Sequence, residues 1–148
     1  VRYYRKYHVS RCPDVIIVEI GASEKGKVSF EAAISRKERA EIQTYENGTV
    51  RVSGELDSGS DAQGLRYAAF ATVLAEGKEA EKNGLNVRNA DRAWIVISAA
   101  TSWFEGDGYD AKALSDLKAA TDGINGRGMD RYEHITETLE AKKKLEEK

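Results

Sequence analysis

The first hundred residues alternate between apolar and polar side chains over short stretches, a pattern that predicts β-strands. Residues 2–9 alternate loosely, which indicates a strand with one face in water. Val15–Ile20 is a β-branched run that predicts a buried strand, and Val28–Ser35 alternates again. Two longer apolar stretches, Leu65–Ala75 and Ala93–Trp103, predict the longest strands of the chain.

Turns rich in asparagine and glycine separate the shorter strands. Asn47-Gly48 is the dipeptide that best fits a type I′ turn, and Asn83-Gly84 gives a second turn signal. The four short strands that flank these turns are expected at Glu41–Tyr45, Thr49–Ser53, Lys78–Glu81 and Leu85–Val87. Strands at this spacing predict a mainly β fold, an antiparallel β-sandwich or a curved sheet.

The last part of the chain changes to a helical pattern. Leu114, Leu117 and Ala120 recur at helical spacing, and three glycines in Gly123–Gly128 are expected to break that helix. Met129–Lys148 is rich in strong helix formers and carries a short apolar stripe that fades into charged residues. We therefore expect one or two C-terminal helices after the sandwich.

Composition limits the class of protein. A chain of 148 residues is normally one domain, and we divide it into a β-sandwich over residues 1–104 and a loop with a helical tail over residues 105–148. The net charge of −2 argues against general nucleic-acid binding, and no apolar run is long enough to cross a membrane. Cys12, the single cysteine, excludes an intrachain disulfide. A first residue that is Val1 rather than Met indicates a mature or excised fragment, or a truncated gene product.

The acidic residues provide no convincing catalytic or metal site. Glu105–Asp110 places three carboxylates close together, as a Ca²⁺ site requires, but the EF-hand pattern is absent and a solvated loop is the expected outcome. Asp57–Asp61 is interpreted in the same way. His8 and His134 are too distant in sequence to indicate a metal site without further ligands. We expect no cofactor, no metal and no catalytic residue in this chain.

Aromatic residues near the end of the last long strand are the candidate binding residues. Trp103 lies beside Phe104 and Tyr109, and aromatic faces at a loop mouth can stack on sugar rings. The alternative is that they anchor the loop against the edge of the sandwich. Trp94 lies inside the expected strand and is predicted to belong to the core. Trp103 and Tyr109 are therefore the candidate carbohydrate-binding residues.

Five segments, in order along the chain, resemble glycoside hydrolase family 95, the α-L-fucosidase-like enzymes. They are Tyr4–Val18, Gly26–Phe30, Gly64–Tyr67 with Val73–Gly77, Ala93–Ser102, and Asp110–Leu114. Each motif is short, and the resemblance rests on their common order over about the first 120 residues.

The resemblance implies an N-terminal β-super-sandwich that a helical linker joins to an (α/α)6 catalytic barrel. This chain is similar to the second half of that sandwich and the start of the linker, so no catalytic residue is carried onto it. The implied partner is the catalytic barrel of the parent enzyme, with glycans as a further expected ligand. An extracellular or periplasmic location would follow from the same resemblance.

Two other functions remain open at this point. A stand-alone carbohydrate-binding sandwich would use the aromatic residues around Trp103. A structural or assembly module would pair an open sheet edge with another chain, because unpaired strand edges favour association. Half of a super-sandwich should also expose apolar surface where further strands belong.

Overall fold

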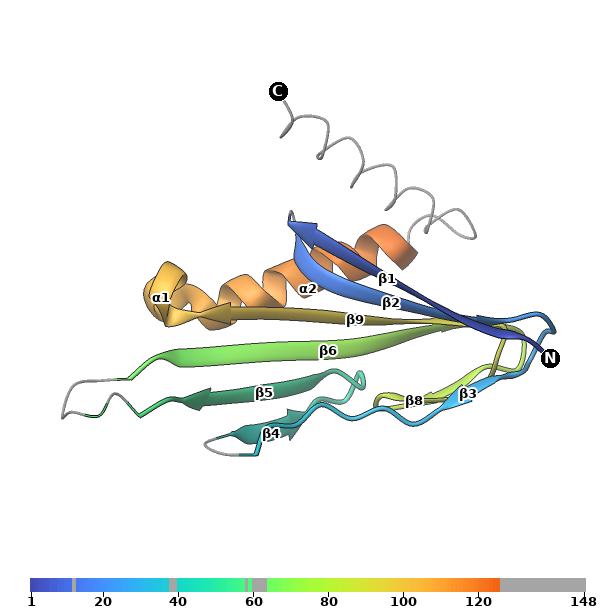
Figure 1. Ribbon diagram of the computed structural model, residues 1–148, viewed down its shortest axis with the longest axis horizontal. Helices are drawn as coiled ribbons and strands as arrows, with labels where there is room; N and C mark the ends of the chain where they lie inside the picture. Colours follow the sequence, from blue (N-terminus) through green and yellow to red (C-terminus); the bar gives the residue numbers. More distant parts are fainter. Residues whose placement is uncertain (12, 38–39, 58, 60–63, 126–148) are drawn as a thin grey trace, which may run out of the picture.

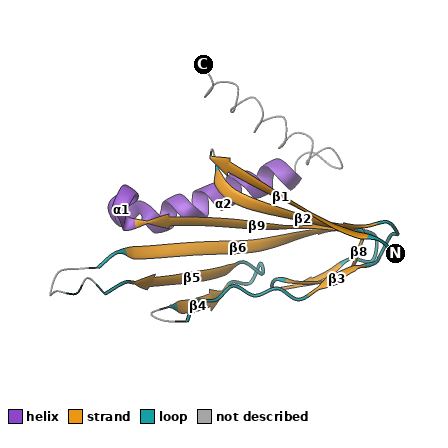
Figure 2. Ribbon diagram, viewed as in Figure 1, coloured by secondary structure: helices purple, strands orange, loops and turns teal. Residues whose placement is uncertain are grey.

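The computed structural model consists of two antiparallel sheets and one long helix (Figures 1 and 2). It describes residues 1–11, 13–37, 40–57, 59 and 64–125. The larger sheet is covered by the helix on one face and, in part, by the smaller sheet on the other. The chain is therefore a mainly β protein with a β-sandwich followed by a helix, as the alternation predicted.

The larger sheet has six strands in the order β1-β2-β9-β6-β5-β4. Their bounds are β1 (Tyr3–Arg11), β2 (Asp14–Ala22), β9 (Arg92–Thr101), β6 (Arg66–Glu76), β5 (Val50–Glu55) and β4 (Glu41–Thr44). The two long apolar stretches of the sequence form the central strands β6 and β9. They lie at the centre because both of their faces carry apolar side chains that need cover.

The smaller sheet has the order β3-β8-β7, with bounds β3 (Val28–Phe30), β8 (Asn86–Ala90) and β7 (Glu81–Asn83). It lies at one end of the larger sheet, on the face away from the helix (Figure 1). Val28 of β3, Val87 of β8 and Leu85, which lies between β7 and β8, are buried in one cluster with Ala71 and Val73 of β6. This cluster is the hydrophobic core between the two sheets.

The helical segment consists of α1 (Ser102–Glu105), the 3-10 turn η1 (Gly106–Gly108) and α2 (Tyr109–Asn125). The side of α2 that faces the sheet carries four buried residues at helical spacing: Ala113, Leu117, Ala120 and Ile124. The two alanines allow a close approach of the helix to the strands. Because the helix lies this close, the buried Oγ of Ser98 on β9 donates a hydrogen bond of 2.7 Å to the carbonyl oxygen of Ala113.

Several expected bounds are wrong. The strand expected over Val28–Ser35 ends at Phe30, because the next residues leave the ladder while Ala32 and Ile34 still pack against the core. The N–H of Ala32 donates to Asn86 Oδ1 at 3.2 Å, so a side chain replaces the ladder partner. The strand expected at Lys78–Glu81 instead occupies Glu81–Asn83.

The two ends of the helical segment also differ from expectation. The long strand expected to reach Trp103 ends at Thr101, and Trp103 belongs to α1. The helix α2 continues through Gly123 to Asn125, because the buried Ile124 gives this last turn a contact with the core. The expectations for Cys12, His134 and a helix over Met129–Lys148 lie outside the described residues.

The turn between β4 and β5 is not the expected type I′ turn. That type needs a positive φ at both central residues, whereas Gly48 has φ 88° and Asn47 does not have a positive φ. The N–H of Gly48 donates to the Tyr45 carbonyl at 3.0 Å, and Asn47 Oδ1 accepts from the N–H of Thr49 at 3.0 Å. The connection is a three-residue loop with glycine at its left-handed position.

Gly21 provides a test of the packing between β1 and β2. A Cβ atom at this position would lie 2.2 Å from Cζ of Tyr4, its partner in the ladder, so the ring covers the glycine directly. We expect Gly21→Ala to lower the free energy of unfolding by about 1–3 kcal/mol, because the tyrosine ring has to move away. Chemical denaturation measures the change.

Gly123→Ala is the matched control for this substitution. Gly123 is helical, and a Cβ atom there would meet no atom of the described residues within 4 Å. The control should raise stability by about 0.5–1 kcal/mol, because alanine is the better helix former. Equal effects of the two alanines would contradict the role of Tyr4 packing.

Candidate functional site

The two tryptophans have opposite environments. Trp94 is 1% exposed and lies in the core beneath α2, which confirms the prediction for this residue. Trp103 and its neighbour Phe104 are 78% and 85% exposed on α1, so neither anchors the loop by burial. Ser102, the first residue of α1, fixes this helix to β6, because its Oγ accepts a hydrogen bond of 3.0 Å from the N–H of Arg66.

Tyr109 begins α2 and is held from two sides. Its ring packs against the core beneath the helix, and the guanidinium carbon of Arg66 lies 5.5 Å from the ring centroid. One face of the ring is therefore already covered by a cation. The side chain is half-buried and forms part of a pocket wall.

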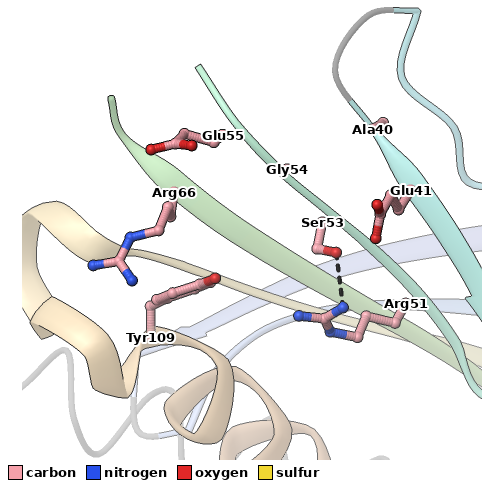
Figure 3. Close-up of a pocket in the computed structure, with 8 residues that line it drawn as sticks. All are labelled: Ala40, Glu41, Arg51, Ser53, Gly54, Glu55, Arg66 and Tyr109. Carbon is pink, nitrogen blue, oxygen red and sulfur yellow. Dashed lines mark hydrogen bonds between the residues drawn. The ribbon is translucent and has the colours of Figure 1, made fainter. Parts of the chain in front are cut away.

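The pocket lies where α2 begins and the sheet continues past the helix (Figure 3). It has a volume of about 540 Å³ and is open to solvent on one side. Its wall consists of Ala40, Glu41, Arg51, Ser53, Gly54, Glu55, Arg66 and Tyr109. In the ladder Arg51 faces Phe70, Ser53 faces Ala68 and Glu55 faces Arg66, so these strand residues share the face that α2 covers.

Two arginines attach the helical segment to this face of the sheet. Arg51 Nε and Nη2 each donate a hydrogen bond of 2.9 Å to the Asp110 carboxylate, and Nη1 donates to Ser53 Oγ at 2.7 Å. Arg66 Nη2 donates to Asp107 Oδ1 at 2.6 Å. The hydrogen bond to each aspartate raises the pKa of its arginine above the ordinary value, so both guanidinium groups stay charged.

Ion pairs engage most of the acidic loop that was considered as a calcium site. Two of its three carboxylates, those of Asp107 and Asp110, form ion pairs with Arg66 and Arg51. Within the described ranges, no group of three or more histidine, cysteine, aspartate or glutamate side chains is placed to hold a metal ion. Nor is any described helix long and apolar enough to cross a membrane.

The wall of the pocket is suited to hydrogen bonding rather than to apolar burial. The exposed carboxylates of Glu41 and Glu55 can accept hydrogen bonds. The hydroxyl groups of Ser53 and Tyr109 can donate or accept them. Such a wall can match a ligand rich in hydroxyl groups. Local sequence patterns did not identify Arg51, which comes into the site only through the pairing of β5 with β6. Arg66 lies in Gly64–Tyr67, a segment that carries the family resemblance, but the sequence indicated no role for it.

The structure separates the two candidate carbohydrate-binding residues. Tyr109 lines the pocket, whereas Trp103 is not part of its wall and extends from α1. Sugar binding at either residue stays a prediction.

Residues 1–105 match the family described as glycosyl hydrolase family 65, N-terminal domain. The chain belongs to this family. A search of the curated proteins gives no match. The expectation of a glycoside hydrolase N-terminal domain is therefore confirmed, while the α-L-fucosidase-like assignment to family 95 stays a prediction.

The paired hydrogen bonds of Arg51 predict how this family 65 N-terminal domain holds its helix. Arg51→Lys should lower the free energy of unfolding by about 1 kcal/mol, because an ammonium group cannot make two parallel bonds to Asp110. Thermal unfolding measures the loss. Arg88→Lys, at an exposed position of β8, is the matched control and should change stability little. Equal losses in the two variants would contradict the tethering role.

Proposed function

We propose that this domain is the non-catalytic N-terminal β-sandwich portion of an α-L-fucosidase-like glycoside hydrolase, and that it braces an (α/α)6 catalytic barrel. The observation that carries the proposal is the family match over residues 1–105. The order of the five segments that resemble family 95 supports the finer assignment.

The pocket supports a non-catalytic role. Glycoside hydrolysis needs a carboxylic acid in a desolvated setting, paired with a second carboxylate across the sugar. The two pocket glutamates, Glu41 and Glu55, are both exposed strand residues. Asp107 and Asp110, which lie near the pocket, form ion pairs with Arg66 and Arg51. We therefore assign these two carboxylates a structural role.

An activity assay tests this proposal. The purified 148-residue chain, incubated with 4-nitrophenyl α-L-fucoside, should release no nitrophenol above the buffer rate. The complete parent protein, expressed from the longer reading frame, should release nitrophenol from this substrate and not from the matching α-glucoside. Turnover by the chain alone would overturn the non-catalytic role. A parent protein inactive on fucosides would overturn the finer assignment.

A carbohydrate-binding sandwich is the second candidate function, and the polar pocket around Tyr109 favours it. Binding is measured with the purified chain on a glycan panel. Tyr109→Phe removes only the hydroxyl group and should weaken binding at the pocket without unfolding the domain. Trp103→Ala should do the same if the exposed indole stacks on a sugar. Absence of binding across the panel would remove this candidate.

An assembly role is supported by the uncovered apolar surface of β1 and β2. Tyr7, Val9 and Ile16 are 64%, 68% and 43% exposed on the sheet face away from α2. β1 also ends the larger sheet, so one of its edges has no strand partner among the described residues. Further strands of the parent protein or another chain would cover this surface. A monomer at high concentration in analytical ultracentrifugation would contradict self-association.

A further inference from the structure

The most exposed large hydrophobic side chains of the described residues are neighbours on one short helix. Trp103 and Phe104 are 78% and 85% exposed, more than any other described large hydrophobic residue. α1 lies at the end of β9, at the opposite end of the molecule from β3 and β8 (Figure 1). Exposed aromatic residues of this kind are typical anchors of protein interfaces.

The scaffold holds this aromatic pair in place. Arg66 connects three segments, because its N–H donates to Ser102 Oγ and its guanidinium donates to Asp107 and stacks on Tyr109. The N–H of Gly106 donates to the Ser102 carbonyl and closes the short helix. An anchor presented on a fixed scaffold loses little conformational freedom when it binds. The pair is therefore organised for binding before a partner arrives.

The directions of the two side chains favour a protein partner over a sugar. Consecutive residues on a helix point about 100° apart, since a turn holds about 3.6 residues. Trp103 and Phe104 therefore cannot form one flat stacking platform. The polar side chains that would complete a sugar site line the pocket at Tyr109, and Trp103 is not in that wall. Diverging aromatic side chains instead fit separate recesses of a concave protein surface.

The charge around the aromatic pair indicates the charge expected on the partner's surface. Residues 102–110 contain Glu105, Asp107 and Asp110 and no lysine or arginine. Arg66 and Arg51 neutralise the two aspartates, which leaves Glu105 as the exposed charge next to Phe104. A complementary surface would be apolar at its centre and basic at its rim.

We propose that Trp103 and Phe104 anchor this domain on the catalytic domain of its parent protein, in separate apolar recesses of a concave surface with a basic rim. The inference rests on the proposed function and names the contact that it needs. It assigns Trp103 to a protein interface and not to a glycan subsite.

The test measures binding of the purified chain to the separately expressed catalytic domain by isothermal titration calorimetry. The double variant Trp103→Ala/Phe104→Ala should bind at least about 30-fold more weakly, as expected for interface hot spots. Ile42→Ala is the matched control, because Ile42 is a 55% exposed apolar residue on β4, and it should bind as the unmodified chain does. Glu105→Lys should also weaken binding, and more at low salt than at high salt.

Three outcomes would overturn the inference. The double variant could bind as tightly as the unmodified chain, which leaves the proposed function intact. It could unfold at a lower temperature as an isolated domain, which would make the aromatic pair structural. It could instead lose affinity for a saccharide, which would assign the pair to sugar binding. A parent reading frame without a catalytic domain would overturn both this inference and the proposed function.

Discussion

Trp94→Ala should lower the free energy of unfolding by about 3–5 kcal/mol, the usual cost of truncating a fully buried large aromatic residue. Trp94 is 1% exposed on the central strand β9 and belongs to the core cluster beneath α2. Its neighbours in that cluster include Ile17 of β2, Phe70 of β6 and Leu117 of α2. The substitution therefore leaves a cavity at the place where the helix and the sheet meet.

Urea denaturation followed by circular dichroism measures this loss. Trp94→Phe is the matched control and should lose less, because most of the apolar volume is kept. The buried indole Nε1 has no hydrogen-bond partner in the part of the chain that the structure describes, so the control breaks no hydrogen bond seen there. A loss below about 1 kcal/mol for the alanine variant would mean that α2 does not depend on this contact.

Arg92→Met should cost about 3–5 kcal/mol of unfolding free energy, because it leaves the buried Glu19 carboxylate without its counter-charge. Glu19 is 2% exposed, and its Oε1 lies 3.3 Å from Arg92 Nε. Its other oxygen, Oε2, is buried and has no hydrogen-bond partner among the described residues. The guanidinium of Arg92 also lies 5.7 Å from the Trp94 ring centroid, so the pair is part of the same core region.

A double-mutant cycle separates the ion pair from packing. Glu19→Met combined with Arg92→Met removes both charges and should recover most of the stability lost in Arg92→Met. Equilibrium denaturation of the four proteins provides the coupling energy. If the double variant were as unstable as Arg92→Met alone, the loss would come from the contact of Arg92 with Trp94 and not from an unpaired buried charge.

The alternation of residues determined most of the elements of this protein. The β-branched run Val15–Ile20 predicted a buried strand, but β2 buries Val15 and Ile17 on one face and leaves Ile16 43% exposed on the other, because only the first face is covered by α2. Helical spacing predicted the stripe of Leu117 and Ala120 on α2. The exact ends of the elements could not be obtained in this way, because Ala32 and Ile34 are buried without belonging to a ladder.

The candidate site depended on tertiary structure. The sequence identified Tyr109 and Trp103 as aromatic residues near one strand end, but only the fold shows that the first lines a pocket and the second does not. Arg51 and Asp110 lie 59 residues apart in the chain. The sequence by itself determined the approximate positions of most strands and of the helix, because periodicity is a local property. Only the tertiary structure brought the arginines, aspartates and glutamates together, since strand pairing and helix docking are contacts between distant segments.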